Sequence, residues 1–264
     1  MRLMLRRYES EEDYWRIRAF LREVFLLNGR QELSWQVARL DYWRWHVVEN
    51  CQVCPAIEEV TYLWETPDGR IAAVLNPEGR GDVHLQVHPG LGTAELEEEM
   101  IALAEERLTT PLAGGGHRLQ VWARQHDSRR REILARRGFA VGDWPEYNRQ
   151  RQLDAVLPEP QPVPGYTVRP LGGVEELPAR GWASWRGFHE GEPDDRYEGW
   201  EWYLNLQRIP LYRRDLDIVA VTSTGEIAAF CTIWYDDVVS HGLYGAGGHG
   251  AGTPAARPGQ GGTV

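Results

Sequence analysis

The pattern of apolar and polar residues is most regular between residues 82 and 108. Apolar Val83, Leu85 and Val87 alternate with polar neighbours, as in a half-buried strand. Residues 89–92 break this alternation, and beyond them apolar residues recur at helical spacing. The pattern therefore predicts a strand that passes through a Gly-containing turn into a helix. Such a turn either offers N–H groups and a positive helix end to a phosphate or is an ordinary strand-to-helix connection.

The pattern up to residue 157 predicts one domain that mixes strands and helices. Predicted strands cover residues 3–7, 60–65, 70–76, 82–87, 117–124 and 147–153. Predicted helices cover residues 13–27, 34–48, 94–108 and 128–137. A Pro-Asp-Gly turn between the second and third strands favours a hairpin. The fold class we expect is α+β, with a mixed, mostly antiparallel sheet flanked by helices.

A similar order of elements starts again after a Pro-rich segment, residues 158–165. This segment predicts a stiff, extended linker. Beyond it the pattern predicts a strand at 166–171, helices at 175–188 and 194–207, and strands at 217–223 and 226–235. We therefore expect tandem domains of one type, 1–157 and 166–244, with the second incomplete. Residues 245–264 are dominated by Gly, Ala and Pro, so we expect poor packing after about Leu243.

Composition is that of a soluble globular protein of 264 residues, with 42% hydrophobic and 26% charged residues. The net charge of -10 argues against nucleic-acid binding and is compatible with an amine-bearing partner. No apolar run reaches the length of a membrane span, and the N-terminus lacks the apolar core of a signal peptide. We therefore expect a cytoplasmic protein with no membrane or nucleic-acid partner.

The chain has three cysteines, Cys51, Cys54 and Cys231, an odd number that favours a reducing compartment. Cys51 and Cys54 form a C-x-x-C close to His46. A zinc site normally needs a second ligand pair, and none stands at a recognisable spacing. We therefore expect structural cysteines and no metal site.

The order of elements, with a V-x-P strand end leading into Gly-x-Gly, resembles the GCN5-related N-acetyltransferase (GNAT) family. The passage EILARRGF, residues 132–139, is also typical of that family. The resemblance covers most of residues 1–154 and the first half of a second copy from about 166. It implies the GNAT fold, acetyl-CoA as cosubstrate and transfer of an acetyl group to a small-molecule or peptide amine.

In the family, a Q/R-x-x-G-x-G/A turn after the fourth strand holds the pyrophosphate of acetyl-CoA with its backbone N–H groups. The resemblance places Val87, His88, Gly90, Leu91, Gly92 and Thr93 at this position and implies that they bind the cofactor. About five residues that normally precede the Gly-x-Gly, including the Gln or Arg, are absent here. The first domain is therefore expected to be degenerate, and the second copy to carry the activity.

The tail, residues 245–264, has a second interpretation. The third base of most codons can be chosen freely without changing the tail. With a suitable choice, the same bases read in a frame shifted by one nucleotide encode EPVGTEPAHQRRGLGKAVL. This peptide contains the complete Q-R-R-G-L-G turn where the second copy needs it. The chain contains no Lys, which suggests a GC-rich gene whose codons permit this reading. We therefore expect a frameshift; the alternative is a natural Gly-rich tail.

Candidate catalytic residues follow from what acetyl transfer requires, namely a deprotonated amine and a proton for the leaving thiolate. His84 is a candidate base in the first domain, and a strand histidine is also often structural. Glu190 and Asp194 lie in an acidic loop that attracts an ammonium group or is simply solvated. Asp236 is a candidate that is also explained as a turn residue.

Two functions from different classes remain open. One is an acetyl-CoA-dependent N-acetyltransferase, which is inactive in this 264-residue chain if the phosphate-binding turn of the second domain is lost. The other is a non-catalytic binding or regulatory module built on degenerate GNAT domains. In either case the incomplete second sheet is expected to be covered by the first domain or by a second copy of the chain.

Overall fold

The computed structural model describes residues 2–153, 156–157, 159–161 and 163–249. The fold is α+β, as the sequence predicted. The chain divides into two compact units, Met1–Gln152 and Leu153–Val264, called unit 1 and unit 2 below. No helix in the described part of the chain is long and apolar enough to cross a membrane.

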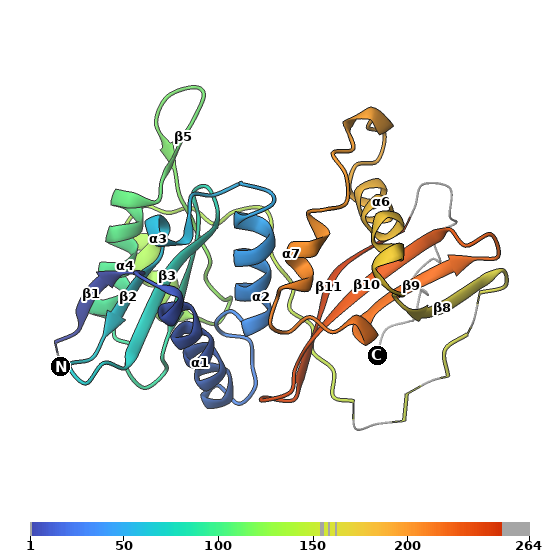
Figure 1. Ribbon diagram of the computed structural model, residues 1–264. Helices are drawn as coiled ribbons and strands as arrows, with labels where there is room; N and C mark the ends of the chain where they lie inside the picture. The colour runs from blue at the N-terminus through green and yellow to red at the C-terminus, as the bar shows by residue number, and fades with distance from the viewer. Residues whose placement is uncertain (1, 154–155, 158, 162, 250–264) are drawn as a thin grey trace. The chain divides into compact units, whose positions relative to one another are not determined.

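The sheet of unit 1 has five strands in the order β1-β2-β3-β4-β7 (Figure 1). These strands are β1 (Met4–Arg7), β2 (Tyr62–Glu65), β3 (Ile71–Gly79), β4 (Asp82–Val87) and β7 (Gln120–Val121). The first four are antiparallel neighbours, and β7 pairs with β4 in parallel. The helices are α1 (Glu11–Leu27), α2 (Val37–Tyr42), α3 (Ile57–Val60), α4 (Ala94–Arg107) and α5 (Ser128–Arg136). Strands β5 (Thr110–Pro111) and β6 (His117–Arg118) form a separate two-stranded ribbon.

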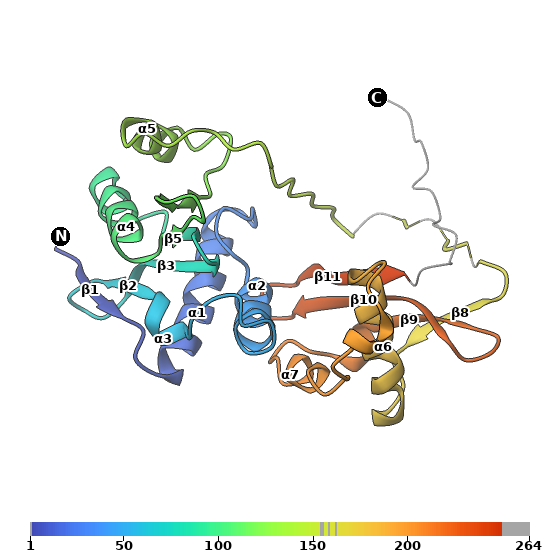
Figure 2. The same cartoon turned by 90° about the horizontal axis from the view of Figure 1, so that it is seen from above.

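Helices α1 and α4 cover opposite faces of this sheet, as Figure 2 shows. Neighbouring residues of β2 establish the arrangement, because side chains alternate along a strand. Trp64 Nε1 donates to Glu99 Oε1 of α4 at 3.0 Å. Glu65 Oε1 lies 2.6 Å from Arg16 Nη2 of α1. The fully buried core includes Ile17, Leu21, Leu63, Trp64, Met100 and Ile101.

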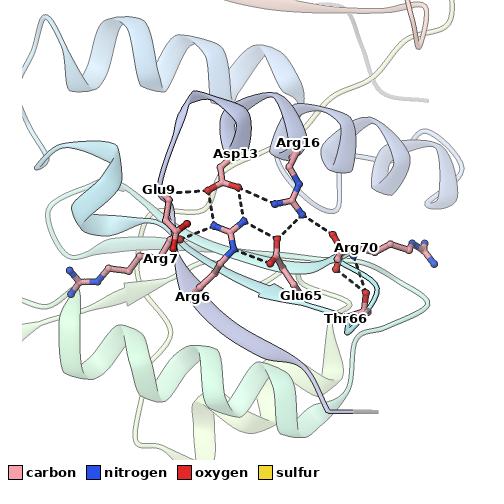
Figure 3. Close-up of polar contacts among 9 residues, drawn as sticks. Arg6, Arg7, Glu9, Asp13, Arg16, Glu65, Thr66 and Arg70 are labelled. Atoms are coloured by element: carbon pink, nitrogen blue, oxygen red, sulfur yellow. Dashed lines mark hydrogen bonds and ion pairs between the residues drawn. The ribbon is translucent and has the colours of Figure 1, made fainter.

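A polar cluster joins α1 to the first two strands (Figure 3). Arg6 of β1 donates through Nη1 and Nη2 to Asp13 at 2.7 and 2.6 Å, and through Nε and Nη2 to Glu65 at 2.9 and 2.8 Å. Arg16 also contacts Asp13 and Glu65. Hydrogen bonds to Arg6 lower the pKa of Asp13 to about 2. The cluster therefore fixes the entry of the chain from β1 into α1.

The predicted strand-turn-helix is present at residues 82–107. Thr93 caps α4 by accepting the N–H of Leu96 on its side chain at 3.2 Å. The strand predicted over 117–124 is wrong in extent, because it is divided into the two-residue strands β6 and β7. Residues of β7 pair with Asp82 and Val83 at the start of β4, and the described ladder contains no pair beyond Val83. The two strands thus pair at one end of β4.

The sheet of unit 2 has the order β11-β10-β9-β8 and is antiparallel throughout its described pairs. These strands are β8 (Tyr166–Pro170), β9 (Asp217–Thr222), β10 (Ile227–Asp236) and β11 (His241–His249). The helices are α6 (Leu177–Phe188) and α7 (Tyr203–Gln207). From its other edge the order is β8-β9-β10-β11, so the strands of unit 2 are neighbours in chain order, as β1-β2-β3-β4 are in unit 1.

The predicted helix over 194–207 is wrong. The segment contains a 3-10 turn, Asp194–Arg196, and the short helix α7. Gly199 between them has φ +109°, a left-handed conformation that interrupts a helix. The α-helix predicted over 34–48 is shorter in the structure. It consists of α2, and a π-helical segment, Trp43–Val48, follows it.

The predicted strand over 147–153 is also wrong. These residues have no strand partner among the described residues, and Tyr147 and Leu153 are exposed. The run Arg149–Gln152 between them is polar and supplies no apolar face for a sheet. Tyr147 and Leu153, separated by five polar residues, therefore do not form one face of a half-buried strand.

The expectation of poor packing after Leu243 is wrong for residues 244–249, which belong to β11 and pair with β10. The strand needs no large side chains, because its backbone supplies the ladder. Gly248 allows α6 to approach closely, since a Cβ built there would lie 3.6 Å from Gly187 Cα and 2.9 Å from Phe230 Cζ. The rest of the tail, residues 250–264, lies outside the described residues, and so does the proposed frameshift region beyond 249.

Candidate functional site

The turn after β4 has its N–H groups paired internally. Gly90 N–H donates to His88 Nδ1 at 3.0 Å. Leu91 and Gly92 donate to the carbonyl oxygen of His88 at 3.0 and 2.9 Å. One residue, His88, therefore accepts all three N–H groups of the Gly-Leu-Gly sequence. In this conformation these groups are not directed at an external anion.

Glu78, Asp82 and His84 come together at the β3–β4 hairpin. The register pairs Asn76 with His84 and Gly79 with Asp82, which leaves Glu78 as the extra residue of a β-bulge. One donor atom from each of the three side chains lies within 4.8 Å of the others. His84 Nε2 lies 3.5 Å from Glu78 Oε2. The hairpin therefore gathers two carboxylates and one imidazole at one point.

Both carboxylates of this cluster are held from outside the hairpin. Arg39 of α2 donates to Glu78 through Nη2 at 2.6 Å and through Nε at 3.0 Å. Trp122, directly after β7, donates through Nε1 to Asp82 Oδ1 at 2.5 Å. Residues from α2, the β3–β4 hairpin and the end of β7 therefore meet here.

The charges of the cluster follow from its surroundings. Burial alone would raise the pKa of Glu78, but His84 and Arg39 outweigh it and lower this pKa to about 2. Burial raises the pKa of Asp82 and lowers the pKa of His84. In neutral solution Glu78 is therefore ionised.

Two indole rings flank the imidazole of His84. Its centroid lies 4.9 Å from that of Trp35 and 5.8 Å from that of Trp122, and the latter rings are stacked at 12°. The backbone N–H of Trp35 is bound to Gln86 Oε1 at 2.7 Å, which fixes the loop before α2. His84 is only 7% exposed, and its Nε2 has no hydrogen-bond partner in the described part of the chain.

Comparison with solved structures places this architecture among known folds. A GCN5-related N-acetyltransferase from Sphaerobacter thermophilus superposes with a TM-score of 0.57 over 96% of this chain and 78% of its own, at 17% sequence identity. The fold is that of the GCN5-related N-acetyltransferases. A glucosamine N-acetyltransferase region of a fungal multi-domain β-N-acetylglucosaminidase was also found, with a TM-score of 0.46 and 13% identity over 96% of this chain and 32% of its own. No protein-family model and no curated protein sequence matches the chain.

This likeness confirms the fold that the sequence resemblance implied. The roles of individual residues stay predictions. Of the predicted cofactor residues, Val87 ends β4, Thr93 caps α4, and His88 with Gly90, Leu91 and Gly92 forms the closed turn. His84, predicted as a base, lies in the cluster at the hairpin. Sequence reasoning missed its partners Glu78, Asp82 and Arg39. The spacing E-x-x-x-D-x-H across a hairpin was the available signal.

The candidate residues of unit 2 lie at separate places in the fold. Glu190 and Asp194 are exposed in the loop between α6 and α7, and Asp194 accepts a hydrogen bond from Arg186 Nη1 at 2.9 Å. Asp236 ends β10 and accepts the N–H of Val238 at 3.2 Å, as a turn residue does. Their catalytic roles stay predictions.

Unit 2 also contains a buried polar group that the sequence pattern did not reveal. Arg180 of α6 and Asp217 of β9 are 2% and 0% exposed, with Nε 3.3 Å from Oδ1. Tyr203 and Tyr212 donate their hydroxyl groups to Asp217 Oδ2. Thr232 donates to Asp217 Oδ1 at 3.3 Å. Because Arg180 and Asp217 at its centre are closed to solvent, we interpret the group as structural.

Proposed function

We propose that the chain is an N-acetyltransferase of the GNAT type, built from two tandem domains, that transfers the acetyl group of acetyl-CoA to an amine. The observation that supports this proposal most is the likeness to a GCN5-related N-acetyltransferase over 96% of the chain. The parallel strand successions of the two units agree with a tandem arrangement. An arginine–carboxylate pair at a spacing of seven residues, Arg6 with Asp13 in unit 1 and Arg169 with Glu176 in unit 2, supports it independently.

Within this proposal the two units have different tasks. The turn of unit 1 satisfies its own N–H groups through His88, so unit 1 is the structural or regulatory copy. Binding of acetyl-CoA is assigned to unit 2, in which β11 occupies the place that β4 has in unit 1. The residues that would follow β11 in the manner of a phosphate-binding turn lie beyond 249, outside the described residues.

The acceptor is proposed to be an amine that carries a positive charge before reaction. Glu190, Glu192, Asp194 and Asp195 give the α6–α7 loop a negative character, and the whole chain has a net charge of -10. An ammonium group is attracted to such a surface and loses its proton before it attacks the thioester.

A second function is favoured by the closed turn itself. If unit 2 also fails to bind acetyl-CoA, the chain is a non-catalytic module that uses the GNAT fold as a scaffold. Fold alone does not imply activity, so the two functions are separated by ligand binding.

The test is calorimetric titration of acetyl-CoA into two proteins, the chain as given and the chain continued in the shifted frame from residue 245. We expect weak or no binding by the first and clear binding by the second, because the shifted frame supplies the Q-R-R-G-L-G turn. Release of free CoA thiol with a panel of primary amines then measures transfer. Failure of the shifted-frame protein to bind would favour the non-catalytic module. Tight binding by the chain as given would move the working site to residues 1–249.

A Gly90→Glu variant of the chain continued in the shifted frame separates the two units in this test, because Gly90 has more room than Gly92 for a side chain. A carboxylate in the turn of unit 1 repels a phosphate placed there. If acetyl-CoA binds only through unit 2, the affinity should stay the same in this variant. A loss of affinity would assign the cofactor to unit 1.

A further inference from the structure

We propose that Glu78, Asp82 and His84 of unit 1 form a binding site for a divalent first-row transition metal ion such as Zn²⁺. The three side chains come from one hairpin, and their donor atoms lie within 4.8 Å of one another. The inference rests on this geometry and does not depend on acetyl transfer.

The distance between the imidazole and the first carboxylate fits metal coordination. His84 Nε2 and Glu78 Oε2 lie 3.5 Å apart. Two ligand atoms at about 2.1 Å from a tetrahedral ion are separated by roughly 3.4 Å. Asp82 completes a set of three protein ligands after a small approach of its carboxylate. Three ligands leave a fourth position open for water or a further donor.

The unpartnered nitrogen of His84 is the second observation that points to a ligand. The side chain is more than nine-tenths buried, and in the described part of the chain Nε2 has only the long contact of 3.5 Å with Glu78 Oε2 and no well-formed hydrogen bond. A buried nitrogen without a partner is destabilising. A metal ion bound at Nε2 would satisfy it and would require the neutral imidazole.

The surroundings have the features of an outer shell that orients metal ligands. Trp122 donates to Asp82, and Arg39 donates to Glu78, so neither carboxylate is free to turn. Each carboxylate oxygen has two lone pairs and accepts a hydrogen bond while it binds an ion. Arg39 also contacts Glu146 at 3.1 Å, so its charge is shared between two carboxylates.

The donor set selects the class of metal. Imidazole nitrogen with carboxylate oxygens suits Zn²⁺, Mn²⁺, Fe²⁺ and their neighbours, whereas Ca²⁺ and Mg²⁺ prefer oxygen ligands alone. The side chain of Glu78 is 32% exposed, which gives an ion access from solvent.

The experiment is equilibrium dialysis of the chelator-treated full chain against Zn²⁺, with Co²⁺ as an optical probe. The chain offers a competing locus, because Cys51 Sγ lies 3.5 Å from His46 Nε2. A Cys51→Ser/Cys54→Ser double variant is therefore the reference protein. We expect one Zn²⁺ bound per reference chain, and Co²⁺ spectra with visible d–d bands but without a thiolate charge-transfer band.

In the reference background, Glu78→Gln and His84→Gln should each weaken binding at least tenfold. Asp215→Asn, an exposed carboxylate of unit 2, is the matched control and should bind as before. Circular dichroism establishes that each variant is folded. If His84→Gln does not fold, Glu78→Gln and Asp82→Asn decide the question. Absence of Zn²⁺ binding in the reference protein, or binding unchanged in the folded ligand variants, would overturn the proposal.

Discussion

Arg6 and Asp13 form a two-pronged ion pair in unit 1, and Arg169 and Glu176 repeat it in unit 2 at the same spacing of seven residues. The Nη atoms of Arg169 lie 2.9 and 2.5 Å from the carboxylate oxygens of Glu176. Each arginine also donates to the carbonyl oxygen of the next residue, at 2.9 Å for Arg6 and 3.0 Å for Arg169. In both units the backbone N–H three residues after the arginine donates to the same carboxylate.

This correspondence extends the likeness of the two units from strand order to single atoms. In each unit the arginine lies on the first strand and fixes the path of the chain toward the first helix. Such agreement in spacing and in donor and acceptor is what duplication of one domain would produce. It therefore supports the proposed tandem arrangement independently of the comparison with other structures.

The Arg6–Asp13 pair predicts a dependence of stability on pH. Hydrogen bonds to Arg6 lower the pKa of Asp13 to about 2, below its ordinary value of 3.8. The stabilisation is therefore present above about pH 4 and is lost as the pH falls toward 2. Asp13→Asn should lower the free energy of unfolding at neutral pH by on the order of 2 kcal/mol. It should also flatten the acid limb, which is the fall of this free energy with pH below about pH 4. Urea denaturation of unit 1 at several pH values measures both effects.

Asp143→Asn is the control for this prediction, because Asp143 is exposed. Its acid limb should follow that of the unmodified chain. An Asp13→Asn protein with an equally steep acid limb would show that the ion pair does not control acid stability.

The turn after β4 predicts a contrast between two glycines. A Cβ built on Gly92 would lie 2.7 Å from Val87 Cγ1, whereas one on Gly90 would meet the nearest atom, of the His88 ring, at 3.3 Å. Valine is stiff, so Gly92→Ala forces the backbone to shift and should cost about 1–3 kcal/mol of stability. Gly90→Ala should be close to neutral. Thermal unfolding of the two variants makes the comparison, and equal losses would contradict the close contact.

The buried group of unit 2 predicts a large effect of a single carboxylate. Asp217→Asn leaves the guanidinium of Arg180, which is 2% exposed, without its counter-ion. Breaking a buried ion pair in this way should cost about 3–5 kcal/mol. Asp215 pairs with Arg213 on the surface, so Asp215→Asn should change stability by less than about 1 kcal/mol. Urea denaturation distinguishes the two variants. A small loss of unfolding free energy in Asp217→Asn would show that water reaches Arg180.

Regular patterns in the sequence predicted much of the fold. Thr93 followed by glutamates marks the start of α4, and the alternation of 82–87 marks β4, because both signals are local. The predictions failed where tertiary contacts decide. The run 245–249 contains no large apolar residue, yet it extends β11, which pairs with β10. Conversely, the segment from Tyr147 to Leu153 has no strand beside it among the described residues, because the five residues between its two apolar ends are all polar.

The candidate site was less predictable than the fold. His84 was identified as a candidate from its strand, but its partners depend on a bulge at Glu78 and on Trp122, which follows a strand of two residues. The spacing E-x-x-x-D-x-H is visible in the sequence, but neither the bulge nor the contact of Trp122 has a signature of its own. The sequence predicts weak phosphate binding by the turn after β4, because this turn is shorter than in the GNAT family. The role of His88 as the acceptor of three N–H groups follows only from the conformation of the turn.

Two glycines of helix α6 give the last prediction, since one is required by packing and the other is not. A Cβ built on Gly181 would lie 2.7 Å from Trp200 Cβ and 3.1 Å from Trp200 Cα, so the backbone before α7 would have to move. A Cβ on Gly187 would make ordinary contacts, the nearest at 3.5 Å with the ring of Phe230. Alanine is favoured over glycine inside a helix by up to about 1 kcal/mol.

Gly187→Ala should therefore keep or raise the melting temperature of unit 2, while Gly181→Ala should lower it despite the same gain in helix propensity. The two substitutions share chemistry, helix and domain, so their difference isolates the contacts of residue 181 with Trp200 and with the Tyr197 hydroxyl group at 3.0 Å. Differential scanning calorimetry of both variants measures it. If Gly181→Ala were as stable as Gly187→Ala, Trp200 would have to yield without cost, and the segment between α6 and α7 would not be held by close packing against α6.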